Sequence, residues 1–308
     1  MDYLHLRNFN QNSTTRGWSI SHRQVEYEES QLLSSADYLE NRKSDFYQGE
    51  DGCIPLHTWQ TATFPSCNTM HEIDARPSDD NFIFINCGSN RCTFLIQGDD
   101  NSKAVLKTQK YRKSFSDYNF EMARVDGPSM ERLTKSKYIT SIYGLCGASQ
   151  ITEFSEGGNI HDRIKEARLT KTDPISPSEK LKIGYQIATA VADMHSFESD
   201  LVTSLVHLDI CCHQFMLIDG VYKLGDFHLS AFTRKDKDTG DICLEHPLTM
   251  HPKLRSPEEF YEHDNGGRIP LSNADMFMMG NVMYYVLTNR WLFEGFSNSV
   301  AKQKIMNG

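Results

Sequence analysis

Two aspartates on either side of a predicted β-hairpin are the residues of this 308-residue chain best placed to do chemistry. Asp209 precedes, and Asp226 follows, two short apolar segments that flank the dipeptide Asp219-Gly220. Apolar segments around an Asp-Gly dipeptide predict a β-hairpin, and a hairpin brings its two ends close together. The two carboxylates are therefore expected to converge on one spot, where one accepts a proton and the other holds a divalent cation.

Composition narrows the class of protein that can carry this site. The chain is 39% hydrophobic and 24% charged, which argues against wholesale disorder. Its net charge of −9 argues against nucleic acid as a partner. No apolar run approaches the ~20 residues that span a bilayer, and the start of the chain lacks the apolar core of a signal peptide. We therefore expect no membrane span and a cytoplasmic location by default.

The eight cysteines are scattered along the chain, and none form a C-x-x-C pair, which argues against a zinc site. The sequence favours reduced, partly buried thiols, as is usual in the cytosol. A secreted form with disulfides is the alternative if the true N-terminus lies upstream.

The first 80 residues are polar and contain too few apolar residues for a core of their own, so they are predicted to form an N-terminal extension. From residue 82 onward, short segments rich in β-branched and aromatic residues are separated by turn residues, which predicts an antiparallel sheet. Its five predicted strands are 82–87, 92–97, 104–107, 139–145 and 150–154.

The chain after residue 155 is predicted to be helical. A helix capped by Ser178 extends to about residue 195, and a second, very apolar helix begins at Asn273, which is predicted to cap it. Together with the sheet, this gives an α+β fold.

The motifs around the two aspartates resemble those of the protein kinases. His207-Leu208-Asp209 and Asp226-Phe227-His228 are similar to the family's H-R-D and D-F-G, and Lys107 stands at the lysine of V-A-I-K. The resemblance implies a bilobal kinase-like domain over 81–308, with a small lobe over 81–154 and a large lobe over 155–308.

Several positions depart from the family pattern. Leu208 replaces the arginine of H-R-D, and His228 replaces the glycine of D-F-G. Arg91 stands at the last glycine of the Gly-rich loop. Its guanidinium either substitutes in part for the phosphate contacts of that loop or is solvated, and we expect it to be solvated. Glu258 matches the acid of A-P-E, and its usual arginine partner is expected from helices that are missing at the end of the chain. These departures suggest a divergent branch, similar in part to protein-O-mannose kinase and algal kinase-like proteins.

The resemblance implies ATP and Mg²⁺ as cofactors. Lys107 is then expected to bind the α- and β-phosphates, and Asp226 to hold Mg²⁺ with Gln214 as a second metal ligand. Asp209 is expected to accept the proton of the substrate hydroxyl. The other nucleotide-binding residues implied are Gly88, Ala104, Asp126, Glu153, Ser155 and Met216.

Asp126 is the expected partner of Lys107, on a helix within 114–135. Gly127-Pro128 argues against Asp126 lying inside that helix, and Glu121 is the alternative.

The function predicted by this resemblance is transfer of the γ-phosphate of ATP to a hydroxyl of a protein or glycan. The alternative is a pseudokinase that binds nucleotide or serves as a scaffold. It is favoured by the replaced motif residues, whereas Lys107, Asp209 and Asp226 favour the enzyme.

Overall fold

A computed structural model describes most of the chain from residue 52 onward. The described residues are 52–57, 60, 67, 70, 82–88, 91–98, 101–111, 117–170, 174–199, 201–245 and 251–307. Side chains are described for all of these except 117–121. The side chain of Glu121, the alternative partner of Lys107, lies outside this set.

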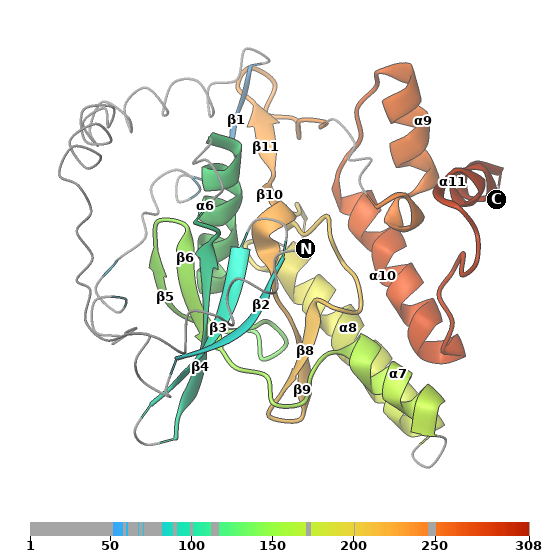
Figure 1. The fold of residues 1–308 in the computed structure, drawn as a ribbon. Coiled ribbons are helices and arrows are strands. Elements are labelled where there is room, and N and C mark those ends of the chain that lie inside the picture. Colours follow the sequence, from blue (N-terminus) through green and yellow to red (C-terminus); the bar gives the residue numbers. More distant parts are fainter. Residues whose placement is uncertain are drawn as a thin grey trace. The chain divides into compact units, whose positions relative to one another are not determined.

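A five-stranded antiparallel sheet has the strand order β2-β3-β4-β6-β5, which confirms the predicted sheet (Figure 1). Phe94 on β3 stacks on Phe82 of β2 with ring centroids 4.7 Å apart, so cross-strand aromatic pairs stabilise its edge. The strands are β2 (Phe82–Cys87), β3 (Arg91–Gln97), β4 (Lys103–Gln109), β5 (Ile142–Cys146) and β6 (Ser149–Glu153).

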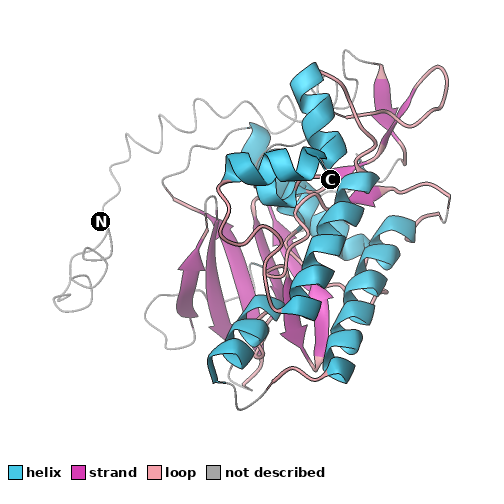
Figure 2. Ribbon diagram, turned by 90° about the vertical axis from the view of Figure 1, so that its right-hand side faces the viewer, coloured by secondary structure: helices cyan, strands magenta, loops and turns pink. Residues whose placement is uncertain are grey.

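Of the six described α-helices, all but α6 lie in the second half of the chain, and Figure 2 shows the sheet strands gathered apart from most of the helices. The hydrophobic core lies largely among α8, α10 and the β8–β9 hairpin. The helices are α6 (Asp117–Arg132), α7 (Ile160–Thr170), α8 (Pro177–Ser196), α9 (Pro257–Asn265), α10 (Ser272–Thr288) and α11 (Asn298–Asn307). Two 3-10 helices are η2 (Phe227–Leu229) and η3 (Pro252–Leu254).

The predicted helix starts need correction. Ser176, not Ser178, caps α8, because its side chain accepts the backbone N–H of Glu179 and Pro177 opens the helix. Asn273 lies inside α10 and does not cap it. The α+β class itself is confirmed.

The helix α6 continues through Pro128, contrary to the expectation from Gly127-Pro128. Gly127 is packed directly against Leu145 of β5, and a Cβ at this position would lie 2.3 Å from a Leu145 methyl carbon. Tertiary packing of the helix on the sheet therefore outweighs the local cost of the proline. The consequence is that Asp126 lies in the body of α6.

The predicted hairpin is confirmed as β8 (Phe215–Ile218) and β9 (Val221–Leu224). Its two turn residues, Asp219 and Gly220, have φ angles of 51° and 73°. Positive φ at both central residues suits a type I′ turn, which is why Asp-Gly favours this connection.

Two further strand pairs hold the segment that follows the hairpin. β7 (Leu205–Val206) pairs with β10 (Ala231–Phe232), and β1 (Cys53–Pro55) pairs with β11 (Arg234–Asp236). Gln60 donates to the Thr233 carbonyl at 3.0 Å, next to these strands. Residues of the predicted extension thus contact the segment after Asp226 directly.

The expectation of reduced cysteines is wrong for six of the eight. Disulfides join Cys53 to Cys243, Cys67 to Cys146, and Cys87 to Cys92. Cys211 and Cys212 remain free thiols. The sequence separations of 190 and 79 residues explain why no local spacing indicated the first two bonds.

Among the described helices, none has the length and apolar character needed to cross a membrane.

Candidate active site

Lys107 and Asp226 lie together, although 119 residues separate them in the sequence. The Lys107 ammonium nitrogen is 3.4 Å from Asp226 Oδ1. Lys107 lies on β4 in the sheet, and Asp226 lies at the end of the β8–β9 hairpin, just before η2. One residue from each half of the chain therefore contributes to a single charged site.

The hairpin also connects Asp209 with Asp226, as its geometry predicted. Gln214 donates its amide hydrogen to Asp209 Oδ2 at 2.7 Å. The carbonyl of Gln214 in turn accepts the N–H of Gly225, the residue before Asp226, at 3.0 Å. The Gln214 amide oxygen has no hydrogen-bond partner among the described residues and remains open to another ligand.

Asp126 is the structural centre of the site. Its carboxylate is fully buried, and it accepts the backbone N–H of Phe227 at 2.7 Å and the side-chain amide of Gln150 at 2.9 Å. A guanidinium N–H of Arg91 lies 2.5 Å from the same carboxylate. Asp126 thereby fixes α6 to β6, to β3 and to the backbone that follows Asp226.

Arg91 is not solvated, so that expectation is wrong. Its side chain is only 14% exposed and bridges Asp126 to Asp226 Oδ1, the latter at 2.7 Å. The expected pair of Lys107 with Asp126 is not among the ion pairs of the described residues, because Arg91 takes Asp126 and Lys107 contacts Asp226. Two cations from adjacent strands thus share two carboxylates.

His228 is a third partner of Asp226, beside Arg91 and Lys107. Its Nδ1 lies 3.1 Å from Asp226 Oδ1 without the alignment of a hydrogen bond. Burial lowers the pKa of His228, but the carboxylate of Asp226 outweighs burial and raises the pKa above its ordinary value. Burial would raise the pKa of Asp226, yet Lys107, His228 and Arg91 hold it well below the usual range. Asp226 is therefore ionised throughout the neutral range.

The loop that carries Asp209 is held by a carboxylate on α10. The buried carboxylate of Asp275 accepts the backbone N–H groups of His207 and Leu208, each at 2.8 Å. His195 of α8 lies 2.9 Å from the same carboxylate. Asp275 therefore holds the backbone of this loop in place.

Glu259, not Glu258, is the buried acid at the start of α9. Glu258 is exposed, whereas Glu259 is fully buried and accepts from Arg255 at 3.0 Å. Arg255 is also fully buried and donates to the Leu208 carbonyl at 2.9 Å. We expected the arginine partner of this acid to be missing together with the later helices. Instead, Arg255 supplies it for Glu259, and Arg255 also connects α9 to the Asp209 loop, where Leu208 has replaced an arginine.

The remaining predicted nucleotide-binding residues lie around the sheet and the connection that follows it. The N–H of Gly88 donates to the Arg91 carbonyl at 2.9 Å, and the Cys87–Cys92 disulfide joins the strand residues on either side. Successive side chains of β4 point to opposite faces of the sheet, so Ala104 and Lys107 lie on opposite faces. Val105, two residues before Lys107, lies on the same face as Lys107. Sequence reasoning missed Val105.

The connection after the sheet is held by its own side chains. The carboxylate of Glu153 accepts from Lys223 at 2.7 Å, and Ser155 donates to the Leu217 carbonyl at 2.8 Å. Met216 lies on β8 beside this connection, where it forms a β-bridge with Asn159. The segment from Glu153 to Ser155 is therefore fixed against the hairpin that leads to Asp226.

A pocket of about 680 Å³ opens beside Asp209. Its walls come from the Asp209 loop, from η3 and from the segment after α10, and they include Cys211, His213, His251 and Trp291. Burial, followed by the charge of Asp209, raises the pKa of Cys211 to about 12. That thiol is therefore protonated at neutral pH and is not a nucleophile. Asp209 and Glu294 are the two acids in the lining of this pocket.

Comparison with known proteins agrees with this geometry. A search of curated proteins finds no match to the chain. Residues 88–308, well over half of the sequence, match the family model described as the protein kinase domain. The matched region contains Lys107, Asp209 and Asp226, and it has the expected mixed fold with a five-stranded sheet. The chain belongs to the protein kinase domain family.

Proposed function

We propose that the protein transfers the γ-phosphate of Mg-ATP to a hydroxyl group of a protein or glycan. Kinase-type phosphotransfer is the general activity of the family to which the chain belongs. The observation that carries the proposal is the contact between Lys107 and Asp226, with Asp209 connected to the same place through Gln214. A protein that had lost catalysis would have no reason to retain Asp209 as a base, Asp226 as a metal ligand and Lys107 as a phosphate-binding cation in this arrangement.

The donor set at this site fits a magnesium nucleotide. Asp226 is 29% exposed, and its Oδ2, together with the Gln214 amide oxygen, offers the hard oxygen ligands that Mg²⁺ prefers. Lys107 binds the α- and β-phosphates, and Arg91, which is attached to Asp126, contributes a second cation beside them. Gly88, Val105, Met216 and the backbone of Glu153 and Ser155 surround the base. When bound, Mg²⁺ neutralises charge on the phosphates.

Asp209 orients the acceptor and takes its proton. Gln214 holds the carboxylate by donating to one oxygen, and the pocket beside Asp209 has room for a side chain or a sugar ring. Trp291 in its wall offers a flat apolar face to such a group. Catalysis by positioning and charge stabilisation requires no further nucleophile from the protein.

The test is transfer of labelled γ-phosphate to acceptor or water by the wild type, Lys107→Met and Asp226→Ala. Removal of either charge is expected to lower the rate about 10²–10³-fold, because each stabilises charge that develops on the phosphates. Lys103→Met is the matched control, since Lys103 lies on the same strand, is exposed and pairs with Glu156 at the surface. Equal rates in all four proteins would exclude the proposal.

A pseudokinase is the second candidate, and the cations around Asp226 favour it. Arg91, Lys107 and His228 all lie within 3.4 Å of the single oxygen Oδ1, so Mg²⁺ has to compete for this carboxylate. A nucleotide-binding pseudokinase would show a higher melting temperature with Mg-ATP but no transfer, because ligand binding to the native state stabilises it. A scaffold would show neither.

The domain boundary, the branch of the kinase family and the cellular compartment are part of the same proposal. The kinase-like domain begins near residue 81, after a polar extension, and the altered H-R-D and D-F-G motifs place the chain in a divergent branch with some similarity to protein-O-mannose kinase. The three disulfides favour an oxidising compartment over the cytoplasm.

A further inference from the structure

We propose that His161, Cys212 and His213 form a binding site for one Zn²⁺ ion, which joins the Asp209 loop to the start of α7. This site is separate from the magnesium-nucleotide site, and nothing in the proposal depends on phosphotransfer. The sequence argued against zinc because no C-x-x-C pair exists, but here the ligands come from two elements 51 and 52 residues apart.

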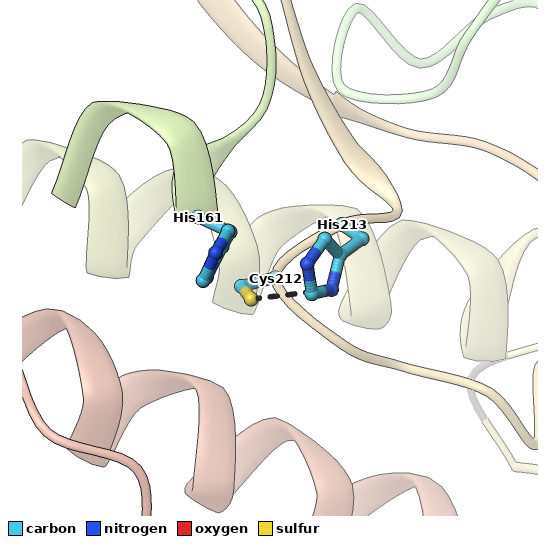
Figure 3. A group of neighbouring side chains, drawn as sticks. All are labelled: His161, Cys212 and His213. Carbon is cyan, nitrogen blue, oxygen red and sulfur yellow. Dashed lines mark hydrogen bonds between the residues drawn. The ribbon is translucent and has the colours of Figure 1, made fainter. Parts of the chain in front are cut away.

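The three ligand atoms already lie close enough to surround an ion. All lie within 4.8 Å of one another, and Cys212 Sγ is 3.7 Å from His213 Nδ1 (Figure 3). Ligand atoms around a tetrahedral Zn²⁺ stand about 3.3–3.6 Å apart, given Zn–N near 2.0 Å and Zn–S near 2.3 Å. The ligand atoms therefore have to approach one another by no more than about 1.5 Å to surround the ion.

The position of His161 is fixed as a metal-ligating histidine requires. Its Nδ1 lies 3.0 Å from the hydroxyl of Tyr285 on α10, which leaves the other ring nitrogen for an ion. The ring also stacks on Trp291, with centroids 5.6 Å apart. A partner on the second nitrogen fixes the tautomer and orientation of a ligating imidazole. Asn159 accepts the backbone N–H of Asp162, the residue after His161, at 3.0 Å and so caps the first turn of α7.

Aromatic packing alone accounts for only part of this cluster. His161 and His213 have ring centroids 4.6 Å apart and belong to a stack with Tyr285 and Trp291, which explains why the rings are close. It does not explain why the fully buried thiol of Cys212 lies against both imidazoles. A ligand set of two imidazoles and one thiolate binds zinc in preference to magnesium or calcium, which favour oxygen ligands.

Zinc at this place would have a structural consequence for the neighbouring loop. Cys212 and His213 lie between Asp209 and Gln214, so an ion that joins them to α7 fixes this part of the loop. Three protein ligands leave a fourth position for water or a bound molecule, and His213 also lines the pocket beside Asp209.

The test is titration of the metal-free protein with Co²⁺, followed by absorption spectroscopy. Co²⁺ reports a thiolate ligand by a charge-transfer band, which carboxylate sites such as Asp226 do not produce. We expect saturation at one equivalent, displacement by Zn²⁺, and loss of the band in Cys212→Ser. Cys211→Ser is the matched control, because Cys211 is the adjacent free thiol, with Sγ 4.0 Å from the same His213 nitrogen, yet lies outside the cluster.

Absence of the band in the wild type, or its loss in Cys211→Ser with retention in Cys212→Ser, would overturn the proposal.

The variant Tyr285→Phe provides a second test, which leaves every ligand in place and is useful if Cys212→Ser does not fold. Removal of the hydroxyl beside His161 is expected to weaken Zn²⁺ binding about 10–100-fold, measured by competition with a chromophoric chelator. Unchanged affinity in Tyr285→Phe would show that His161 is not a ligand.

Discussion

Asp209→Asn is expected to lower the rate of γ-phosphate transfer about 10²–10⁴-fold, the usual contribution of a general base. Asparagine has the same shape and still accepts the hydrogen bond that Gln214 donates to Asp209 at 2.7 Å. It cannot take the proton of an acceptor hydroxyl. Affinity for Mg-ATP should therefore stay nearly unchanged, because Lys107, Arg91 and Asp226 are untouched.

Single-turnover transfer and calorimetric titration with Mg-ATP separate these two effects. The matched control is Asp219→Asn in the turn of the same hairpin. Position 219 is exposed to solvent, and asparagine tolerates its φ of 51°. It should leave both quantities unchanged. Loss of nucleotide binding in Asp209→Asn, with transfer falling only in proportion, would mean that the role of Asp209 has been misassigned.

Glu259→Ala is expected to lower the free energy of unfolding by about 3–5 kcal/mol, because it leaves a buried charge without its partner. Arg255 and Glu259 are both fully buried, and their ion pair is 3.0 Å long. Glu259 also accepts the backbone N–H of Ser256 at 2.7 Å, so the substitution removes half of a capping box as well. Arg255 would then hold the Leu208 carbonyl less firmly, and transfer should fall together with stability.

Urea unfolding of Glu259→Ala and Glu258→Ala gives a direct comparison between neighbouring glutamates. Glu258 is exposed, so its removal should change stability by no more than about 0.5 kcal/mol. Similar losses in the two variants would contradict the assignment of Glu259 as the buried acid of this segment.

The parts of the fold that follow from short stretches of sequence could be predicted. The hairpin follows from Asp219-Gly220, whose left-handed backbone suits few other residue pairs, and the sheet follows from β-branched and aromatic segments separated by turns. The connection from Asp209 through Gln214 to Gly225, the residue before Asp226, then follows from the hairpin, and the place of Lys107 followed from the family resemblance.

The parts that depend on long-range partners could not be predicted. Arg91 finds Asp126 and Asp226 at separations of 35 and 135 residues, and no local pattern distinguishes this buried cation from a solvated one. Asp126 lies inside α6 because Gly127 packs on Leu145, which the helix-breaking signal of Pro128 concealed. The Cys53–Cys243 disulfide depends on the pairing of β1 with β11, which only tertiary structure brings about.

The most direct test of the central claim is calorimetric titration of ATP with and without Mg²⁺, for the wild type and Asp226→Ala. If Asp226 holds a divalent cation beside Lys107, Mg²⁺ should strengthen ATP binding to the wild type by about tenfold or more, as charge-assisted contacts of ~1.5–3 kcal/mol imply. That enhancement should disappear in Asp226→Ala. Absence of ATP binding to the wild type, or an equal effect of Mg²⁺ on both proteins, would contradict the account.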